Sequence, residues 1–99
     1  MDDNTISIDK DLEDLIPGYL ENRLRDIASI EEALIKNDFE TIRILGHSMK
    51  GSGGGYGFAA ITEIGKRIEE AAKKMDKKVI TEQVEELSTY LRNITIKYE

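Results

Sequence analysis

The sequence predicts an all-α fold: an antiparallel up-and-down four-helix bundle preceded by a short additional N-terminal helix. Apolar residues recur at intervals of three and four over almost the whole chain, which is typical of amphipathic helices. Proline occurs once, and few stretches alternate apolar and polar residues as a half-buried strand would. Because the polar breaks between the periodic segments are short, neighbouring helices should pack side by side in opposite directions.

The first two helices are expected to meet at the only proline. Residues Asp9 to Ile16 have the pattern of a short helix, and Pro17 then suits the opening turn of a long helix that ends near Lys36. The buried stripe predicted for this long helix consists of Ile16, Leu20, Leu24, Ile27, Ile30 and Leu34.

Three further helices follow a polar break at Asn37 and Asp38, where the aspartate can cap the next helix. The apolar side of the next helix is Phe39, Ile42, Leu45, Met49 and Tyr56. The apolar side of the helix after that is Phe58, Ile61, Ile64, Ile68, Ala71 and Met75. That of the last is Ile80, Val84, Leu87, Leu91, Ile94 and Tyr98.

Length and composition exclude several classes of protein. The 99 residues suffice for a single helical domain, residues 1–99, of which we expect only residues 1–8 to be loose. Cysteine is absent, and no secretory signal or apolar run long enough for a membrane span is found, so we expect a cytoplasmic protein. The net charge of −6 repels nucleic acid and anionic membranes, so neither is expected as a partner.

The only histidine, His47, is the strongest candidate for chemistry. At about 100° per residue, it falls away from the apolar stripe of its helix and should face solvent. Its expected neighbours on that surface are Arg43, Lys50, Gly51 and Gly54. A single histidine without cysteine makes a poor metal site, so no metal ligands are assigned.

Glycines cluster around this histidine, although each one inside a helix costs about 1 kcal/mol relative to alanine. Either residues 51–57 are simply a flexible loop, or the bare backbone lets another protein approach the imidazole closely. Two nucleotide-binding motifs fail here. A Walker motif needs its lysine after the second glycine, whereas here the lysine precedes that glycine. A dinucleotide-binding motif needs a doubly wound sheet, which a chain predicted to have no strands cannot build.

The segment around the histidine resembles the signature of histidine phosphotransfer (HPt) domains, in which a helix carries histidine, a variable pair, Lys-Gly and further small residues. The positions of this motif are filled by His47, Lys50, Gly51, Gly54 and Gly57. Residues 12–23 are also similar to the opening helices of the family, so the resemblance covers nearly the whole chain. The three consecutive glycines at positions 53–55 are more than the family motif requires. The sequence therefore does not define where the helix bearing His47 ends.

The resemblance implies a monomeric phosphocarrier. His47 would accept a phosphoryl group through Nε2 from the aspartyl phosphate of a receiver domain and pass it to another receiver, and Lys50 would stabilise the phosphoryl oxygens. The expected partners are response-regulator receiver domains and a hybrid sensor histidine kinase. This chain would not be an enzyme and would need no cofactor, because the receiver supplies the acidic pocket and Mg²⁺. Partner contacts are assigned to Arg43, Ile44, Gly51 and Gly54, and a structural role to Gly57.

The alternative interpretation is a helical adaptor, which binds a signalling partner through the His47 face without ever being phosphorylated. The intact set of His47, Lys50 and Gly51 favours the phosphocarrier, because an adaptor has no chemical need for the histidine. The basic run from Lys73 to Lys78 is most simply a solvated helix end, and it could also guide a partner.

Overall fold

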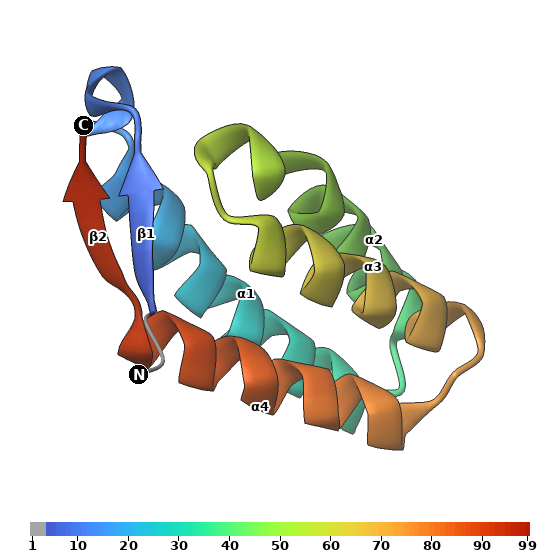
Figure 1. The fold of residues 1–99 in the computed structure, drawn as a ribbon. Helices are drawn as coiled ribbons and strands as arrows, with labels where there is room; N and C mark the ends of the chain where they lie inside the picture. The colour runs from blue at the N-terminus through green and yellow to red at the C-terminus, as the bar shows by residue number, and fades with distance from the viewer. Residues whose placement is uncertain (1–3) are drawn as a thin grey trace.

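The computed structural model describes residues 4–99, which form four long helices and a two-stranded sheet (Figure 1). The elements before the second long helix are strand β1 (Thr5–Ile8), the 3-10 turn η1 (Lys10–Leu12) and helix α1 (Ile16–Ile35). They are followed by helix α2 (Phe39–Ser52), the 3-10 turn η2 (Gly54–Tyr56), helix α3 (Ala59–Lys73), helix α4 (Lys77–Asn93) and strand β2 (Thr95–Tyr98). The prediction of a mostly helical domain with four substantial helices is confirmed.

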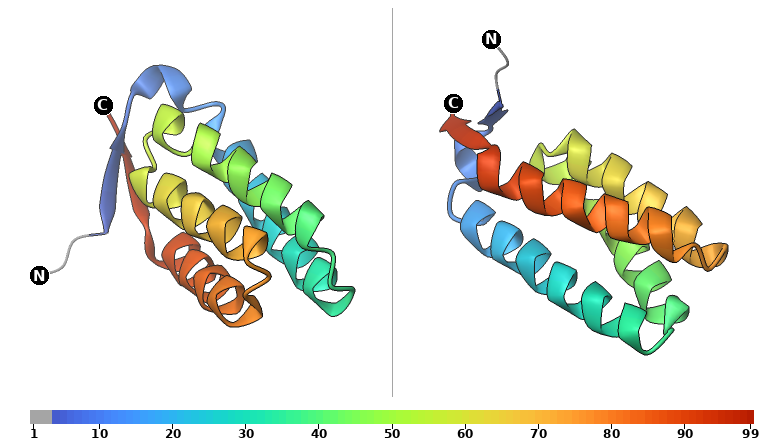
Figure 2. Two further views of the ribbon diagram at one scale, coloured as in Figure 1. Left: turned by 90° about the vertical axis from the view of Figure 1, so that its right-hand side faces the viewer. Right: turned by 90° about the horizontal axis from the view of Figure 1, so that it is seen from below.

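The helices lie side by side in a bundle, with the two strands at one end (Figure 2). In Figure 1 the chain runs along α1, returns along α2, and repeats this course in α3 and α4. Asp38 accepts a hydrogen bond from the backbone N–H of Thr41 at 3.1 Å, so the predicted cap of α2 is confirmed. Asp76 caps α4 in the same way, through the N–H of Val79 at 3.2 Å. Within residues 4–99, no helix combines the length and apolar character needed to cross a bilayer.

The N-terminal segment differs from the prediction. The helix expected over Asp9–Ile16 is reduced to the turn η1, and Thr5–Ile8, expected to be loose, pair in parallel with Thr95–Tyr98. Ile8 is buried against the helices, which gives the strand an apolar anchor. Because a parallel pair between the two chain ends has no local turn signal, the sequence pattern does not reveal it. Residues 1–3 lie outside the described residues.

The predicted helix ends also need correction. Tyr56 lies beyond α2, in the turn η2, and Met75 is exposed in the turn after α3. Helix α4 ends at Asn93, so Ile94 and Tyr98 belong to the C-terminal extended segment. The apolar spacing continues past α2 and α4 because Tyr56, Ile94 and Tyr98 still pack against the core, whereas Met75 does not.

The prediction of which residues form the buried side of α1 is partly wrong. Leu24 is 54% exposed, whereas Tyr19 and Arg23 are buried. Arg23 donates to Asp26 over 2.8 Å and its guanidinium lies 4.4 Å from the centre of the Tyr19 ring. The Tyr19 hydroxyl lies 2.9 Å from Oγ of Ser52, at the end of α2. Satisfied hydrogen bonds and ring contacts therefore allow a charged residue to take the place that periodicity assigns to leucine.

Helices α2 and α3 meet at two glycines. A Cβ atom built on Gly65 would lie 2.5 Å from the backbone nitrogen of Lys50 and 2.7 Å from the carbonyl oxygen of Gly46. One built on Gly46 would lie 2.7 Å from the backbone nitrogen of Glu69. Real Cβ atoms do not approach backbone so closely, and glycine is required at both positions for this contact.

Replacing Gly65 by alanine should therefore destabilise the domain. We expect Gly65→Ala to lower the free energy of unfolding by about 1–3 kcal/mol, because the methyl group must push the two backbones apart. Gly51→Ala is the matched control, since no atom lies within 4 Å of its Cβ position, and it should gain up to about 1 kcal/mol from helix propensity. Urea denaturation measures both values. A Gly65→Ala protein as stable as the wild type would contradict the close contact.

Candidate functional site

His47 lies on the outer side of α2, where its side chain is 65% exposed. The helical spacing predicts this orientation, and the structure confirms it. One turn further on, Gly51 leaves open space beside the ring, with no atom near its Cβ position. The imidazole is therefore accessible to another macromolecule.

The buried carboxylate of Glu69, on α3, holds one nitrogen of this imidazole. Its side chain is 6% exposed, and its Oε2 lies 3.0 Å from Nδ1 of His47. An ionised carboxylate can only accept a hydrogen bond, so Nδ1 carries the hydrogen of the neutral ring. The free electron pair of the ring is then on Nε2, which is the nitrogen available for reaction.

Lys50 completes this cluster from α2. Its Nζ lies 2.8 Å from Oε1 of Glu69, while Nζ of Lys73 lies 4.0 Å from Oε2. The hydrogen bonds from Lys50 and, to a smaller extent, from His47 hold the pKa of the Glu69 carboxyl below its usual range, although burial acts in the opposite direction. The carboxylate therefore stays ionised at neutral pH.

Arg43 lies one turn before the histidine, but its guanidinium is engaged elsewhere. It donates to both carboxylate oxygens of Glu40, from Nε at 3.0 Å and from Nη2 at 2.6 Å. This pairing raises the pKa of Arg43 and lowers that of Glu40. Ile44, also predicted to bind a partner, has an exposed side chain one turn before His47. Arg43 and Ile44 thus lie on the surface around the histidine.

The later glycines form the turn that follows α2, which ends at Ser52. Gly54 lies past this end, so helical spacing does not place it beside His47, and its N–H donates to Oγ1 of Thr62 over 2.7 Å. Gly57 has a φ of 99°, and its Cβ would lie 2.7 Å from Cδ1 of Ile8. Left-handed backbone and the close approach of β1 together explain the glycine at position 57.

The family comparison agrees with this arrangement. A family model described as Hpt domain matches residues 14–95. The chain belongs to the Hpt domain family. Neither a curated protein nor a solved structure gives a significant match. Hpt domains are phosphocarrier modules of two-component phosphorelays, and they interact with response-regulator receiver domains and kinases. The resemblance seen in the sequence is therefore confirmed.

The sequence pattern of this Hpt domain does not single out Glu69, which follows His47 by 22 residues. A signal for it exists on α3. Glu69 lies four residues after Gly65 and eight after Ile61, which places a carboxylate on the buried side of an amphipathic helix. Such a residue needs a partner, and the only histidine on the neighbouring helix is a natural candidate.

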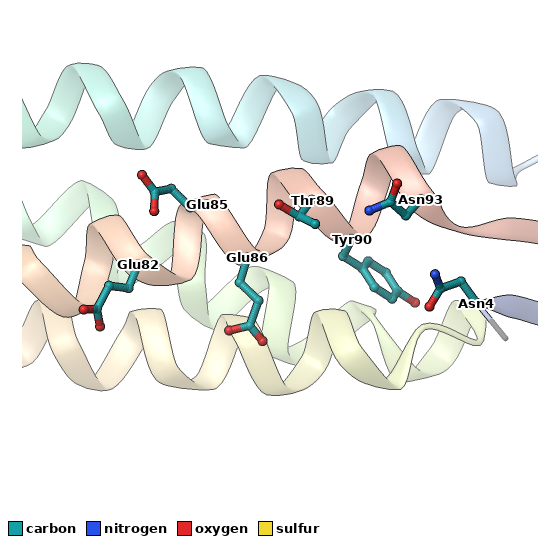
Figure 3. A pocket seen from close by; sticks show the side chains of 7 residues that line it. All are labelled: Asn4, Glu82, Glu85, Glu86, Thr89, Tyr90 and Asn93. Atoms are coloured by element: carbon teal, nitrogen blue, oxygen red, sulfur yellow. The ribbon is translucent and has the colours of Figure 1, made fainter. Parts of the chain in front are cut away.

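Other polar groups of the domain do not join this site. Across residues 4–99, no group of three or more histidine, cysteine, aspartate or glutamate side chains is placed to hold a metal ion. A pocket of about 590 Å³ runs along α4 beside Asn4 and contains Glu82, Glu85 and Glu86 (Figure 3). Its lining includes no residue of α2 or α3, so it is separate from the histidine site.

The hydrogen bond to Glu69 should fix the tautomer of His47. In ¹⁵N NMR spectra recorded at about pH 9, where an ordinary imidazole is neutral, we expect the hydrogen on Nδ1 in the wild type. In Glu69→Gln, an amide that can also donate should allow a mixture of both tautomers. Glu70→Gln, the same change at the exposed neighbouring residue, should leave the wild-type spectrum. A wild-type ring with its hydrogen on Nε2 would contradict the geometry.

The lowered pKa of Glu69 also predicts a pH dependence of stability. A carboxyl whose pKa is lower in the folded state stabilises the fold above its unfolded pKa, near 4.5, and this contribution is lost as the pH falls through the folded pKa. The difference in unfolding free energy between wild type and Glu69→Gln should therefore shrink from about pH 6 to about pH 3. Urea denaturation at each pH measures it, with Glu70→Gln as the control for loss of one carboxylate. A difference that stays constant over this range would be the contrary result.

Proposed function

We propose that His47 of this Hpt domain accepts a phosphoryl group from the aspartyl phosphate of a receiver domain and passes it to another receiver. The observation that carries the proposal is the pairing of an exposed imidazole with a buried carboxylate, 3.0 Å from Nδ1. This pairing leaves the reactive electron pair on Nε2. It also supplies a negative charge on the side of the ring away from the incoming phosphate.

The transfer follows from this arrangement of atoms. The electron pair of Nε2 attacks phosphorus in line, the bond from phosphorus to the aspartyl oxygen breaks, and the aspartate leaves as a carboxylate. Phosphorylation makes the ring more electron-poor, and the Nδ1–H then donates to an ionised Glu69, which stabilises the product. The reverse attack by the aspartate of a second receiver returns the ring to its starting state.

Lys50 is proposed to stabilise the phosphoryl oxygens. It lies one turn after His47 on α2, and its side chain is 38% exposed. The ammonium is held near the imidazole by Oε1 of Glu69 before any phosphate arrives. A flexible cation in this position can turn toward the negative charge that develops during transfer.

The receiver is proposed to dock on Arg43, Ile44 and Gly51 of α2 and on Gly54 in the turn that follows. Exposed apolar surface at Ile44 and open backbone at Gly51 support close approach beside the imidazole. Gly57 has a structural role in this proposal, because its conformation shapes the turn after α2. The receiver would bring the acidic pocket and Mg²⁺ that phosphoryl transfer requires.

We propose further that residues 1–99 belong to one antiparallel helical domain and that the protein is a monomer in the cytoplasm. The proposed partners of the protein are response-regulator receivers and a hybrid sensor histidine kinase. Neither nucleic acid nor a membrane is proposed as a partner. The net charge of −6 supports the latter point. In this transfer the partner receiver domain is the catalyst, and this chain only carries the phosphoryl group.

Phosphorylation can be tested directly by ³¹P NMR with a phosphorylated receiver domain and Mg²⁺. The wild type should give an acid-labile phosphoramidate signal, and His47→Gln should give none while keeping the helical circular dichroism spectrum. We expect Lys50→Met to slow uptake by about 10- to 100-fold, because it removes a cation that lies one turn from His47 and contacts Glu69. Lys78→Met, at an exposed position on α4, should react like the wild type. A folded wild type that several receivers fail to phosphorylate would instead support a helical adaptor.

A further inference from the structure

Two lysines and His47 lie around the two carboxylate oxygens of Glu69. Lys50 occupies Oε1 at 2.8 Å, whereas His47 and Lys73 share Oε2, at 3.0 and 4.0 Å respectively. Lys73 is the most distant of the three, and its side chain is 59% exposed. It follows Glu69 by four residues on α3, in the order that favours a helical ion pair. Lys73 is therefore close to the carboxylate without being its main partner.

A phosphoryl group on His47 would change this balance. If Lys50 turns to the phosphoryl oxygens, Oε1 of Glu69 loses its nearest cation. A buried carboxylate that loses a partner is destabilised, and it must then recover a cation or take up a proton. Protonation would weaken the acceptor that holds the Nδ1–H of His47.

We propose that Lys73 is a positioning residue that replaces Lys50 at Glu69 when Lys50 engages the phosphoryl group. The proposal rests on the phosphocarrier function proposed above. The exposed, flexible side chain of Lys73 needs to move little to close the remaining distance to Oε2. Arg43 also attracts Glu69 from α2, but both ends of its guanidinium fork are bound to Glu40. Lys73 is thus the cation best placed to keep the carboxylate ionised.

A double-mutant cycle in the unphosphorylated protein tests this exchange. Lys50→Met imitates the departure of Lys50, and ¹³C NMR of the Glu69 carboxyl group reports its pKa in each variant. Lys73→Met should raise the pKa of Glu69 only slightly when Lys50 is present. In the Lys50→Met protein it should raise it by about one pH unit, a tenfold change in the dissociation constant. Equal effects of Lys73→Met in the two backgrounds would overturn the exchange.

Two further variants separate this role from a general effect of charge. Lys73→Arg should behave like the wild type in the cycle, because it keeps a cation at the same place. Lys74→Met removes the same charge from the adjacent exposed position, and it should show no difference between the two backgrounds. A response of Lys74→Met equal to that of Lys73→Met would overturn the assignment to Lys73.

Phosphoryl uptake from a phosphorylated receiver with Mg²⁺ supplies the functional readout. We expect Lys73→Met to slow uptake about 3- to 10-fold, with Lys73→Arg and Lys74→Met close to the wild type. Unchanged uptake in Lys73→Met would overturn the positioning role. The pKa cycle needs no phosphate, so a wild type that is never phosphorylated would defeat the proposed function, whereas equal effects in the cycle would defeat the exchange.

Discussion

The contact between Gly46 and Gly65 determines how the site is built. Side chains larger than hydrogen at these positions would collide with the backbone of the opposite helix. This close approach lets the short side chain of Glu69 reach across from α3 to both His47 and Lys50 on α2. Wider separation of the two helices, as methyl groups would impose, would move the carboxylate away from the imidazole. Helix packing and chemistry therefore depend on the same two residues.

Burial and pairing act against each other at the carboxylate. Desolvation disfavours the charge of Glu69, while Lys50 and His47 favour it, and the net effect keeps the group ionised. The imidazole itself remains in solvent, where a partner can reach it. In the proposed transfer, this buried acceptor would prepare the exposed imidazole, and the partner would supply the metal and the rest of the transition-state stabilisation.

Local patterns account for much of what the sequence predicts. Asp38 caps α2, Pro17 lies in the first turn of α1, and His47 faces solvent, because each depends on residues within a turn or two. The pairing of β1 with β2 joins opposite ends of the chain and leaves no local signal. Spacing places Glu69 on the buried side of α3 but does not give its distance from His47. Its position relative to the histidine depends on the distance between α2 and α3. Two glycines that are far apart in the sequence determine this distance.

The most direct measurement is to identify the ring nitrogen that carries phosphorus. With histidine labelled by ¹⁵N, coupling to ³¹P and the ¹⁵N chemical shifts of the phosphorylated protein assign the phosphoryl group to Nδ1 or Nε2. A hydrogen bond from Nδ1 to Glu69 requires phosphorus on Nε2, with the hydrogen still on Nδ1. Phosphorus on Nδ1 would mean that the carboxylate does not hold that nitrogen, and it would contradict the role assigned here to the contact between α2 and α3.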